Sequence, residues 1–363
     1  MRVLFAFAGG NGHLQPLLPL ARAAAGRGHA VAVTGRPGVL PKDFEGFPAG
    51  TDPADPEAGR PALARLDRIR EEREFRDGFG GWIARERATT TSEVARRWRP
   101  DVIVCDEADF GSMIAAESLG IPHASVVVLA AGTFGRPDGL AALLDEARAE
   151  HGLPADPTLA MLDRHLVISP APPSFHARTG TVPMRPMPPA ELSPTTPRTV
   201  YFTLGTIFNT ESGDLFTRVL AGVRDLPIDL VVTVGGGIDP RELGEQPPNV
   251  RVERYIPQAT LLPRCSAVIS HAGSGTVVGA LSYGLPMVLL PMGADQPANA
   301  DRCAELGVAR VLDAVDTTPP DAAEALHAVL TGASFRAAAA SLRAEIAAMP
   351  TPEEVLPRLE ALA

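Results

Sequence analysis

Short apolar runs rich in valine and isoleucine recur along this 363-residue chain, separated by stretches in which apolar residues repeat at helical spacing. This alternation is typical of a parallel sheet, because parallel strands need a crossover helix between them. The sequence predicts nine strands in two groups: 2–8, 30–34, 102–105 and 123–128, then 199–204, 229–234, 250–253, 267–270 and 287–290. We expect each group to form its own doubly wound α/β unit, and the length also favours two domains.

A proline-rich stretch separates the two groups of strands. Nine of the 28 residues from Pro170 to Pro197 are proline, which neither donates to a β-ladder nor continues a helix. We therefore expect a first domain over 1–180, a linker over 181–198 and a second domain over 199–340. In 341–363 the apolar residues stand at near-helical intervals, which predicts one or two closing helices.

The composition argues against several partners and locations. Lys and Arg number 33 against 43 Asp and Glu, and the net charge of −10 makes nucleic acid an unfavourable partner. The apolar runs are far shorter than the roughly 20 residues of a membrane span, and the N-terminal run is too short for a signal peptide. Cys105, Cys265 and Cys303 are too far apart for a metal knuckle or redox pair. We expect a cytoplasmic protein with reduced thiols.

The first predicted strand runs into the glycine-rich turn Gly9-Gly10-Asn11-Gly12-His13. Such a turn lies at the carboxyl edge of the sheet, where open α/β sheets bind ligands. A nicotinamide dinucleotide fits poorly, because Gln15 stands where the Gly-x-Gly-x-x-Gly pattern needs its third glycine and no acidic residue closes the second strand. His13 is therefore either a hydrogen-bonded loop residue or a general base, since imidazole titrates near neutrality.

An acidic residue stands in position to assist such a base. Asp106 directly follows the predicted strand 102–105, so it lies at the same sheet edge as His13 and is the expected partner of the imidazole. Glu107 and Asp109 are rivals for this role, but we expect them to be solvated or to cap the helix that starts near residue 111.

The second half carries the stronger signal, in the segment His271-Ala272-Gly273-Ser274-Gly275-Thr276 between a predicted strand and a helix. Small residues there expose backbone N–H groups at a helix N-terminus, which carries roughly half a positive charge. The segment suits a diphosphate, although the glycines could instead serve only a tight turn, and the absence of a P-loop lysine excludes a Walker motif. Thr206, after the strand 199–204, adds a hydroxyl at the same edge.

Three motifs follow one another in the second half: Tyr255-Ile256-Pro257-Gln258, then His271-x-Gly273-x-Gly275-Thr276, then Asp295-Gln296 with Asn299. This order resembles the donor-binding stretch of the family 1 (UDP-glycosyltransferase superfamily) glycosyltransferases. The segment around Gly12-His13-Leu14 resembles the start of bacterial members that decorate secondary metabolites. The resemblance covers nearly the whole chain and implies a GT-B fold, with two facing Rossmann-like domains, parallel sheets and an interdomain cleft.

The resemblance implies an inverting sugar transfer in which His13 deprotonates the acceptor and Asp106 assists it. The nucleotide sugar is then a co-substrate bound by the second domain through Thr206, Tyr255, Ile256, Gln258, His271, Gly273, Ser274, Gly275, Thr276, Asp295 and Gln296. The family often has a ribose-binding glutamate where this chain has Gly279. A dTDP-sugar lacks the 2′-hydroxyl and loses least from that change, so we expect it to be preferred over a UDP-sugar.

The acceptor is expected to be a small apolar natural product. Its expected contacts are the aromatic side chains of Phe75, Phe79, Trp82, Phe110 and Phe134. The first three of these lie in the Arg- and Glu-rich stretch 58–99, whose charge pattern otherwise predicts only a solvated helix. No Asp-x-Asp pair of the kind that binds Mn²⁺ or Mg²⁺ occurs, so we expect neither a metal nor a cofactor. A non-catalytic binding or auxiliary subunit and a sugar-nucleotide epimerase remain as alternatives.

Overall fold

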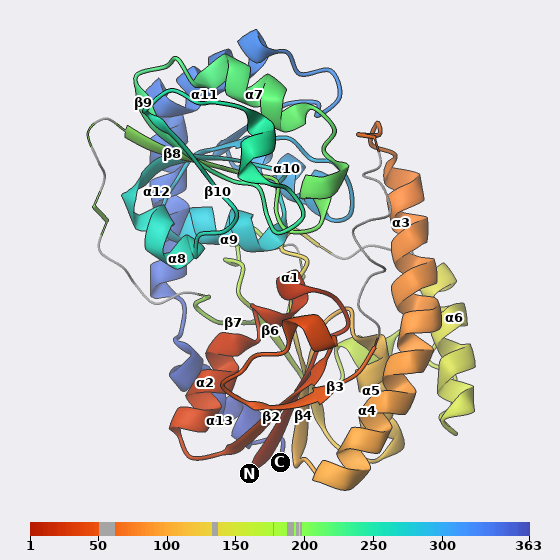
Figure 1. The fold of residues 1–363 in the computed structure, drawn as a ribbon. Coiled ribbons are helices and arrows are strands. Elements are labelled where there is room, and N and C mark those ends of the chain that lie inside the picture. Colours follow the sequence, from red (N-terminus) through yellow and green to blue (C-terminus); the bar gives the residue numbers. More distant parts are fainter. Residues whose placement is uncertain (51–61, 133–136, 177, 187–191, 194–195, 197) are drawn as a thin grey trace. The chain divides into compact units, whose positions relative to one another are not determined.

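The computed structural model describes residues 1–50, 62–132, 137–176, 178–186, 192–193, 196 and 198–363. The chain divides into two compact units, the first made of residues 1–53, 69–186 and 349–363 and the second of residues 54–68 and 187–348. Each unit contains one parallel sheet with helices on both faces (Figure 1). The prediction of two α/β units is thereby confirmed.

The sheet of the first unit has seven parallel strands in the order β3-β2-β1-β4-β5-β6-β7. Its strands are β1 Arg2–Ala6, β2 Ala30–Gly35, β3 Glu45–Pro48, β4 Val102–Asp106, β5 His123–Val126, β6 Leu166–Ser169 and β7 Val182–Pro183. β1 pairs with β4, with Ala6 opposite Cys105, so the turns that follow these two strands are neighbours. This pairing brings the glycine-rich turn next to Asp106.

Helices cover both faces of this sheet and bury alternate strand residues. They are α1 Asn11–Leu14, α2 Leu18–Gly26, α3 Arg68–Asp77, α4 Ala84–Trp98, α5 Phe110–Ser118, α6 Pro137–Glu150 and α13 Pro352–Glu360, with the short helices η1 Pro37–Val39, η2 Gly78–Ile83 and η3 Ala160–Leu162. Val3 and Phe5 of β1 pack with α2 and α13, whereas Leu4 and Ala6 pack with α4 and α5 (Figure 1). Each face of the sheet therefore has its own apolar core, because successive residues of a strand point to opposite faces.

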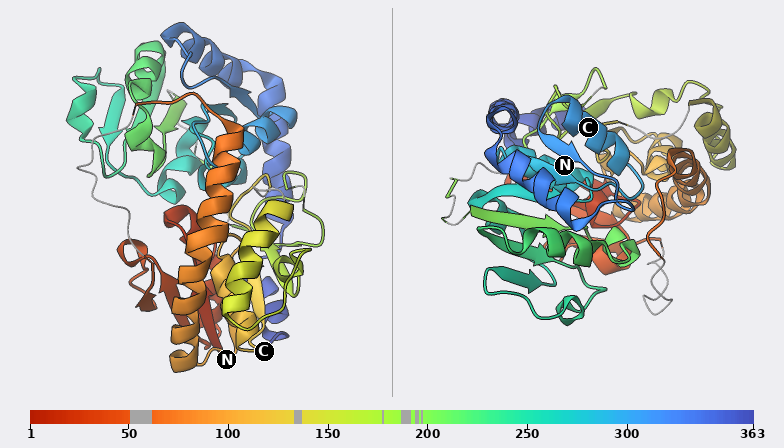
Figure 2. Two further views of the ribbon diagram at one scale, coloured as in Figure 1. Left: turned by 90° about the vertical axis from the view of Figure 1, so that its right-hand side faces the viewer. Right: turned by 90° about the horizontal axis from the view of Figure 1, so that it is seen from above.

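The last helix returns to the first unit. Leu356 and Leu359 of α13 are fully buried against α2, and the Glu360 carboxylate lies 2.7 Å from Nε2 of His29. The N- and C-termini are therefore close together (Figures 1 and 2). Of the closing helices expected over 341–363, α12 belongs to the second unit and α13 to the first.

The sheet of the second unit has six parallel strands in the order β10-β9-β8-β11-β12-β13. They are β8 Arg198–Thr203, β9 Ile228–Thr233, β10 Val250–Glu253, β11 Cys265–Ser270, β12 Met287–Leu289 and β13 Ala309–Val311. The helices are α7 Leu215–Val223, α8 Gln258–Leu261, α9 Ser274–Ser282, α10 Gln296–Glu305, α11 Pro319–Thr331 and α12 Ala333–Ala348, with η4 Phe208–Glu211, η5 Pro240–Leu243 and η6 Leu262–Arg264. α7 and α11 pack on one face, and α9 and α12 lie on the other (Figure 1).

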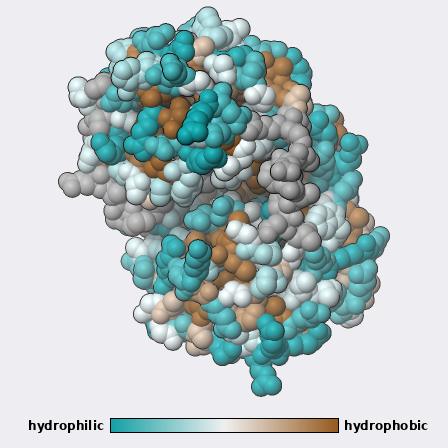
Figure 3. All heavy atoms as spheres, in the orientation of Figure 1, coloured by the Kyte–Doolittle hydropathy of each residue, from teal (hydrophilic) through white to brown (hydrophobic). Residues whose placement is uncertain are grey.

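All nine predicted strands are present, with ends within two residues of those expected. β3, β6, β7 and β13 were not predicted from the sequence; they are short and lie toward the outer parts of the sheets. On the face drawn in Figure 3, hydrophilic residues predominate and apolar residues form small separate groups. Within the described ranges, no helix is long and apolar enough to cross a membrane.

Candidate active site

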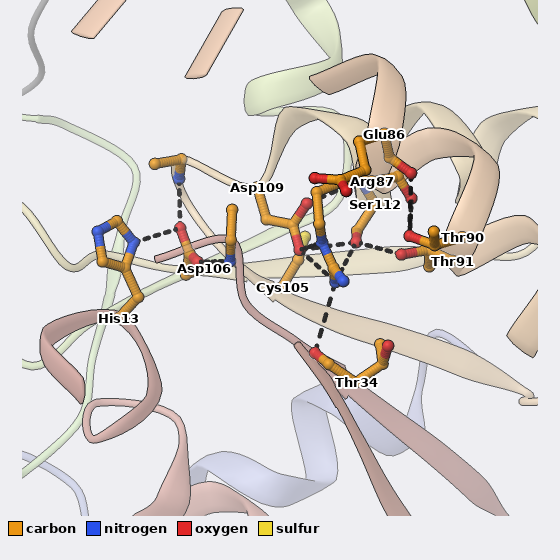
Figure 4. Close-up of polar contacts among 12 residues, drawn as sticks. His13, Thr34, Glu86, Arg87, Thr90, Thr91, Cys105, Asp106, Asp109 and Ser112 are labelled. Carbon is orange, nitrogen blue, oxygen red and sulfur yellow. Dashed lines mark hydrogen bonds and ion pairs between the residues drawn. The ribbon is translucent and has the colours of Figure 1, made fainter. Parts of the chain in front are cut away.

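His13 and Asp106 lie together at the carboxyl edge of the first sheet. Nδ1 of His13 is 3.2 Å from Oδ1 of Asp106 (Figure 4). The Asp106 side chain is fully buried, whereas that of His13 remains 19% exposed, so the imidazole is accessible to a small molecule. The neighbouring β1 and β4 thus bring together the two residues that the sequence analysis paired.

The backbone holds both members of this pair in place. Asp106 accepts hydrogen bonds from the N–H groups of Ala8, at 2.8 Å, and Ala108, at 2.7 Å. A Cβ on Gly9 would lie 2.0 Å from Cδ2 of His13, so glycine is required where the ring covers the turn. A carboxylate only accepts hydrogen bonds, so the hydrogen of a neutral His13 belongs on Nδ1 and the lone pair on Nε2.

A group of aromatic rings lies on one side of the imidazole. The Phe79 ring stacks on His13 with centroids 5.3 Å apart, and Phe75 stacks on Phe79 at 4.9 Å. Phe110 meets Phe75 edge-on but is only 4% exposed, so it supports the aromatic group from the core and does not offer a surface to a ligand. Trp82 is 59% exposed, and Phe134 lies outside the described residues.

The expectation that Glu107 is solvated is wrong. Its buried carboxylate accepts hydrogen bonds from the N–H groups of Val128 and Leu129, at 2.8 and 2.7 Å, and fixes the loop that follows β5. Burial raises the pKa of Glu107 to about 7, although these N–H groups and Arg178 favour the ionised form. A charged residue in a loop gives no sign of such burial in the sequence.

Asp109 caps α5, as expected, by accepting a 3.0 Å hydrogen bond from the Ser112 N–H group. It also forms a buried ion pair with Arg87, whose Nη2 lies 2.8 Å from Oδ2 of Asp109 (Figure 4). Arg87 was not predicted to be a functional residue, because it is one of many arginines in a stretch whose composition is typical of a solvated helix.

In the second unit, His271 follows β11 and its ring is enclosed by two glycines. A Cβ on Gly205 or Gly273 would lie 2.6 or 2.4 Å from Nε2 of His271. Burial lowers the pKa of His271 to about 4, against the opposing effect of a hydrogen bond with the Thr203 backbone. The imidazole is therefore neutral near pH 7 and brings no positive charge to this turn.

The low pKa of His271 predicts a pH-dependent stability of the second unit. Between pH 6.5 and 4 the unfolded chain takes up a proton that the folded unit does not, so the free energy of unfolding should fall by roughly 3 kcal/mol as pH decreases. Urea unfolding of the wild type and His271→Gln at pH 7 and pH 4 measures this. The loss should be roughly 3 kcal/mol smaller in the variant; equal losses in the two proteins would refute the prediction.

A polar cluster surrounds the N-terminus of α9. The Ser274 hydroxyl lies 2.5 Å from Oδ2 of Asp295, and Asn299 Nδ2 donates to the same oxygen at 2.7 Å. Asp295 precedes α10 but its side chain makes no capping hydrogen bond there. Gln296 is almost fully buried, and its Oε1 accepts hydrogen bonds from backbone N–H groups at 292 and 293. The Asp295 carboxylate is thus turned toward the N-terminus of α9.

The remaining residues that the sequence predicts to bind the nucleotide sugar lie near the carboxyl ends of β8 and β10. Thr206 is exposed in the turn after β8, Tyr255 is 70% exposed, and Ile256 is half-buried. Gln258 connects this region to α9, because its Nε2 donates a 3.0 Å hydrogen bond to Oγ1 of Thr276. In the described part of the chain, no group of three or more His, Cys, Asp or Glu side chains is arranged to hold a metal ion.

Gly279 lies about one turn after Thr276 in α9, beside Gln258. A Cβ at this position would stand 3.2 Å from Oε1 of Gln258 and 3.2 Å from Cδ1 of Leu262. The space that a longer side chain would enter is therefore occupied by the Gln258 carboxamide.

Comparison with known proteins gives consistent matches. Residues 217–362 match the family described as erythromycin biosynthesis protein CIII-like, C-terminal domain. The chain is 30% identical to the 10-deoxymethynolide desosaminyltransferase of Streptomyces venezuelae, over 100% of this chain and 97% of that protein. It is 28% identical to the erythronolide mycarosyltransferase of Saccharopolyspora erythraea, over 100% and 99%.

Solved structures agree with these sequence matches. The glycosyltransferase VinC in complex with dTDP has a TM-score of 0.77 at 26% identity, covering 100% of this chain and 99% of VinC. The spinosyn rhamnosyltransferase SpnG, complexed with thymidine diphosphate, has a TM-score of 0.77 at 25% identity, covering 99% and 100%.

Proposed function

The chain belongs to the family 1 glycosyltransferases of bacterial secondary-metabolite biosynthesis and has their GT-B fold, and we propose that it transfers a sugar from a dTDP-sugar to a polyketide acceptor with inversion at the anomeric carbon. The observation that carries this proposal is the His13–Asp106 pair at the carboxyl edge of the first sheet, in which the buried carboxylate faces a partly exposed imidazole stacked on Phe79. The names of its relatives, which include a 10-deoxymethynolide and an erythronolide glycosyltransferase, support an apolar macrolide-type acceptor.

His13 is the proposed general base. An acceptor hydroxyl is a weak nucleophile until its proton leaves, and Nε2 of His13 takes that proton as the oxygen attacks the anomeric carbon. The buried Asp106 carboxylate, 3.2 Å from Nδ1, stabilises the imidazolium that results. The stacked Phe75 and Phe79 rings offer the acceptor an apolar surface beside the base.

The second unit holds the proposed donor. The diphosphate accepts hydrogen bonds from the first N–H groups of α9 and from the hydroxyl of Thr276, beside Ser274 and the neutral His271 ring, and the helix dipole stabilises the charge that develops as it leaves. The exposed Tyr255 ring offers a face to the nucleobase, and Asp295 accepts hydrogen bonds from sugar hydroxyls. This mechanism uses no metal ion.

We expect dTDP to bind more tightly than UDP. With Gly279 in place of a ribose-binding carboxylate, the 2′-hydroxyl of UDP would lose its acceptor, which costs roughly 1 to 3 kcal/mol for a buried group. That is roughly a 5- to 160-fold difference in Kd by calorimetric titration. The dTDP complexes of VinC and SpnG are in line with this choice. Equal or tighter binding of UDP would refute the donor preference.

An assay with dTDP-sugar and a macrolactone tests the activity itself. A transferase releases dTDP only when the acceptor is present, whereas an epimerase changes the sugar nucleotide without an acceptor. A protein that binds dTDP but gives no product in a single-turnover assay would be an auxiliary subunit.

A further inference from the structure

Arg87 of α4 has no part in the proposed mechanism, yet it is the largest fully buried side chain described in the structure. Its Nε and Nη2 atoms donate to Oδ2 of Asp109 at 3.1 and 2.8 Å, and Nη2 also reaches Ser112 Oγ at 3.2 Å and the Thr34 carbonyl at 3.4 Å. The guanidinium thus connects α4, the start of α5 and the end of β2 (Figure 4).

The Arg87–Asp109 pair fixes the far end of the turn that carries Asp106. The Asp109 N–H group donates to the Asp106 carbonyl at 3.0 Å, and the Ala108 N–H group donates to the Asp106 carboxylate at 2.7 Å. Figure 4 shows His13 and Arg87 on opposite sides of this turn. A displacement of Asp109 would therefore move the carboxylate that faces His13.

The same arginine is connected to the other neighbour of His13. Phe79, which stacks on the imidazole, belongs to η2, and η2 leads into α4 through a kink at Gly81. The two helices that Arg87 joins are in close contact, because a Cβ on Gly111 of α5 would lie 2.2 Å from the Ala84 carbonyl oxygen of α4. One ion pair therefore sets the position of α4, with Phe79 before it, against the turn that carries Asp106.

We propose that Arg87 is a positioning residue for the His13–Asp106 pair, acting through Asp109 and α4; this rests on the proposed role of His13 as the base. A buried ion pair adds little stability over apolar residues of similar volume, but its hydrogen bonds impose defined directions on the segments it joins. Here those segments carry Asp106 and Phe79, the two side chains that flank the imidazole.

The test compares Arg87→Met, Arg87→Lys and the double variant Arg87→Met/Asp109→Asn, which removes both charges and leaves a side chain able to cap α5. If the single variant does not fold, the double variant carries the test. We expect kcat to fall roughly 10- to 100-fold in Arg87→Met and in the double variant, with KM and the Kd for dTDP within twofold of wild type. Arg87→Lys, which keeps the positive charge, should have a higher kcat than Arg87→Met.

Arg148→Met is the matched control, because Arg148 forms a buried ion pair with Glu117 near the opposite end of α5, at 2.8 Å. It should lower the melting temperature but leave kcat within twofold. An equal loss of kcat in this control, or wild-type kcat in the double variant, would overturn the proposal.

A double-mutant cycle with His13→Ala separates this inference from the function on which it rests. If Arg87 acts through His13, adding Arg87→Met to His13→Ala causes no further loss of kcat. A full additional loss would overturn the positioning role. Wild-type turnover of His13→Ala alone would overturn the proposed function, whereas an inactive His13→Ala beside a fully active Arg87→Met/Asp109→Asn would overturn only the role of Arg87.

Discussion

Replacing His13 by Ala should lower kcat by roughly 10²- to 10⁴-fold, the contribution typical of a positioned general base. The imidazole stands at the carboxyl edge of the first sheet, 3.2 Å from the buried Asp106 and stacked on Phe79. Without the ring, an acceptor hydroxyl must lose its proton to water. Steady-state kinetics with a dTDP-sugar and a saturating acceptor measures the effect.

An exposed histidine of the same unit serves as the control for this substitution. His165→Ala removes an imidazole outside the site and should leave kcat within twofold. A His13→Ala variant that retains a third or more of the wild-type kcat would show that another group takes the proton.

Asp106→Asn should cost about as much, on the order of 10²- to 10⁴-fold in kcat, although it preserves the size of the side chain. The carboxylate accepts hydrogen bonds from the Ala8 and Ala108 N–H groups and faces the imidazole as well. An amide has one accepting oxygen, so its NH₂ group must point toward either a backbone donor or Nδ1 of His13. Both orientations disturb the imidazole or fail to stabilise its charged form.

Asp101→Asn is the matched control for Asp106→Asn. Asp101 immediately precedes β4, at the other end of the same strand, and its carboxylate accepts a 2.7 Å hydrogen bond from the Arg2 N–H group. This variant should keep kcat within twofold. If Asp106→Asn lowers the melting temperature but leaves kcat unchanged, Asp106 has only a structural role.

The sequence was sufficient for the part of the site that follows from strand order. Valine-rich runs identified the central strands, and the carboxyl ends of parallel strands lie at the same edge of a sheet. That rule predicted that His13 and Asp106 share an edge, and the structure adds that their strands, β1 and β4, are direct neighbours. Short strands such as β7, which spans Val182–Pro183, carry too few residues for a recognisable pattern.

The parts that could not be predicted depend on tertiary contacts of charged residues. Arg87 and Glu107 stand among other charged residues, and their burial follows only from the packing of α4, α5 and the loop after β5. The packing of α13 on the first unit could not be predicted either. The helical spacing of its apolar residues predicts an apolar face, but it does not show which surface covers that face.

The most direct test of the account measures dTDP affinity and turnover on the same preparation of His13→Ala. The account places the base on the first unit and the nucleotide on the second, so the Kd for dTDP should stay within twofold of wild type while kcat falls at least 100-fold. A variant that loses dTDP binding but retains turnover would contradict the assignment of His13 as the base and of the second unit as the nucleotide-binding unit.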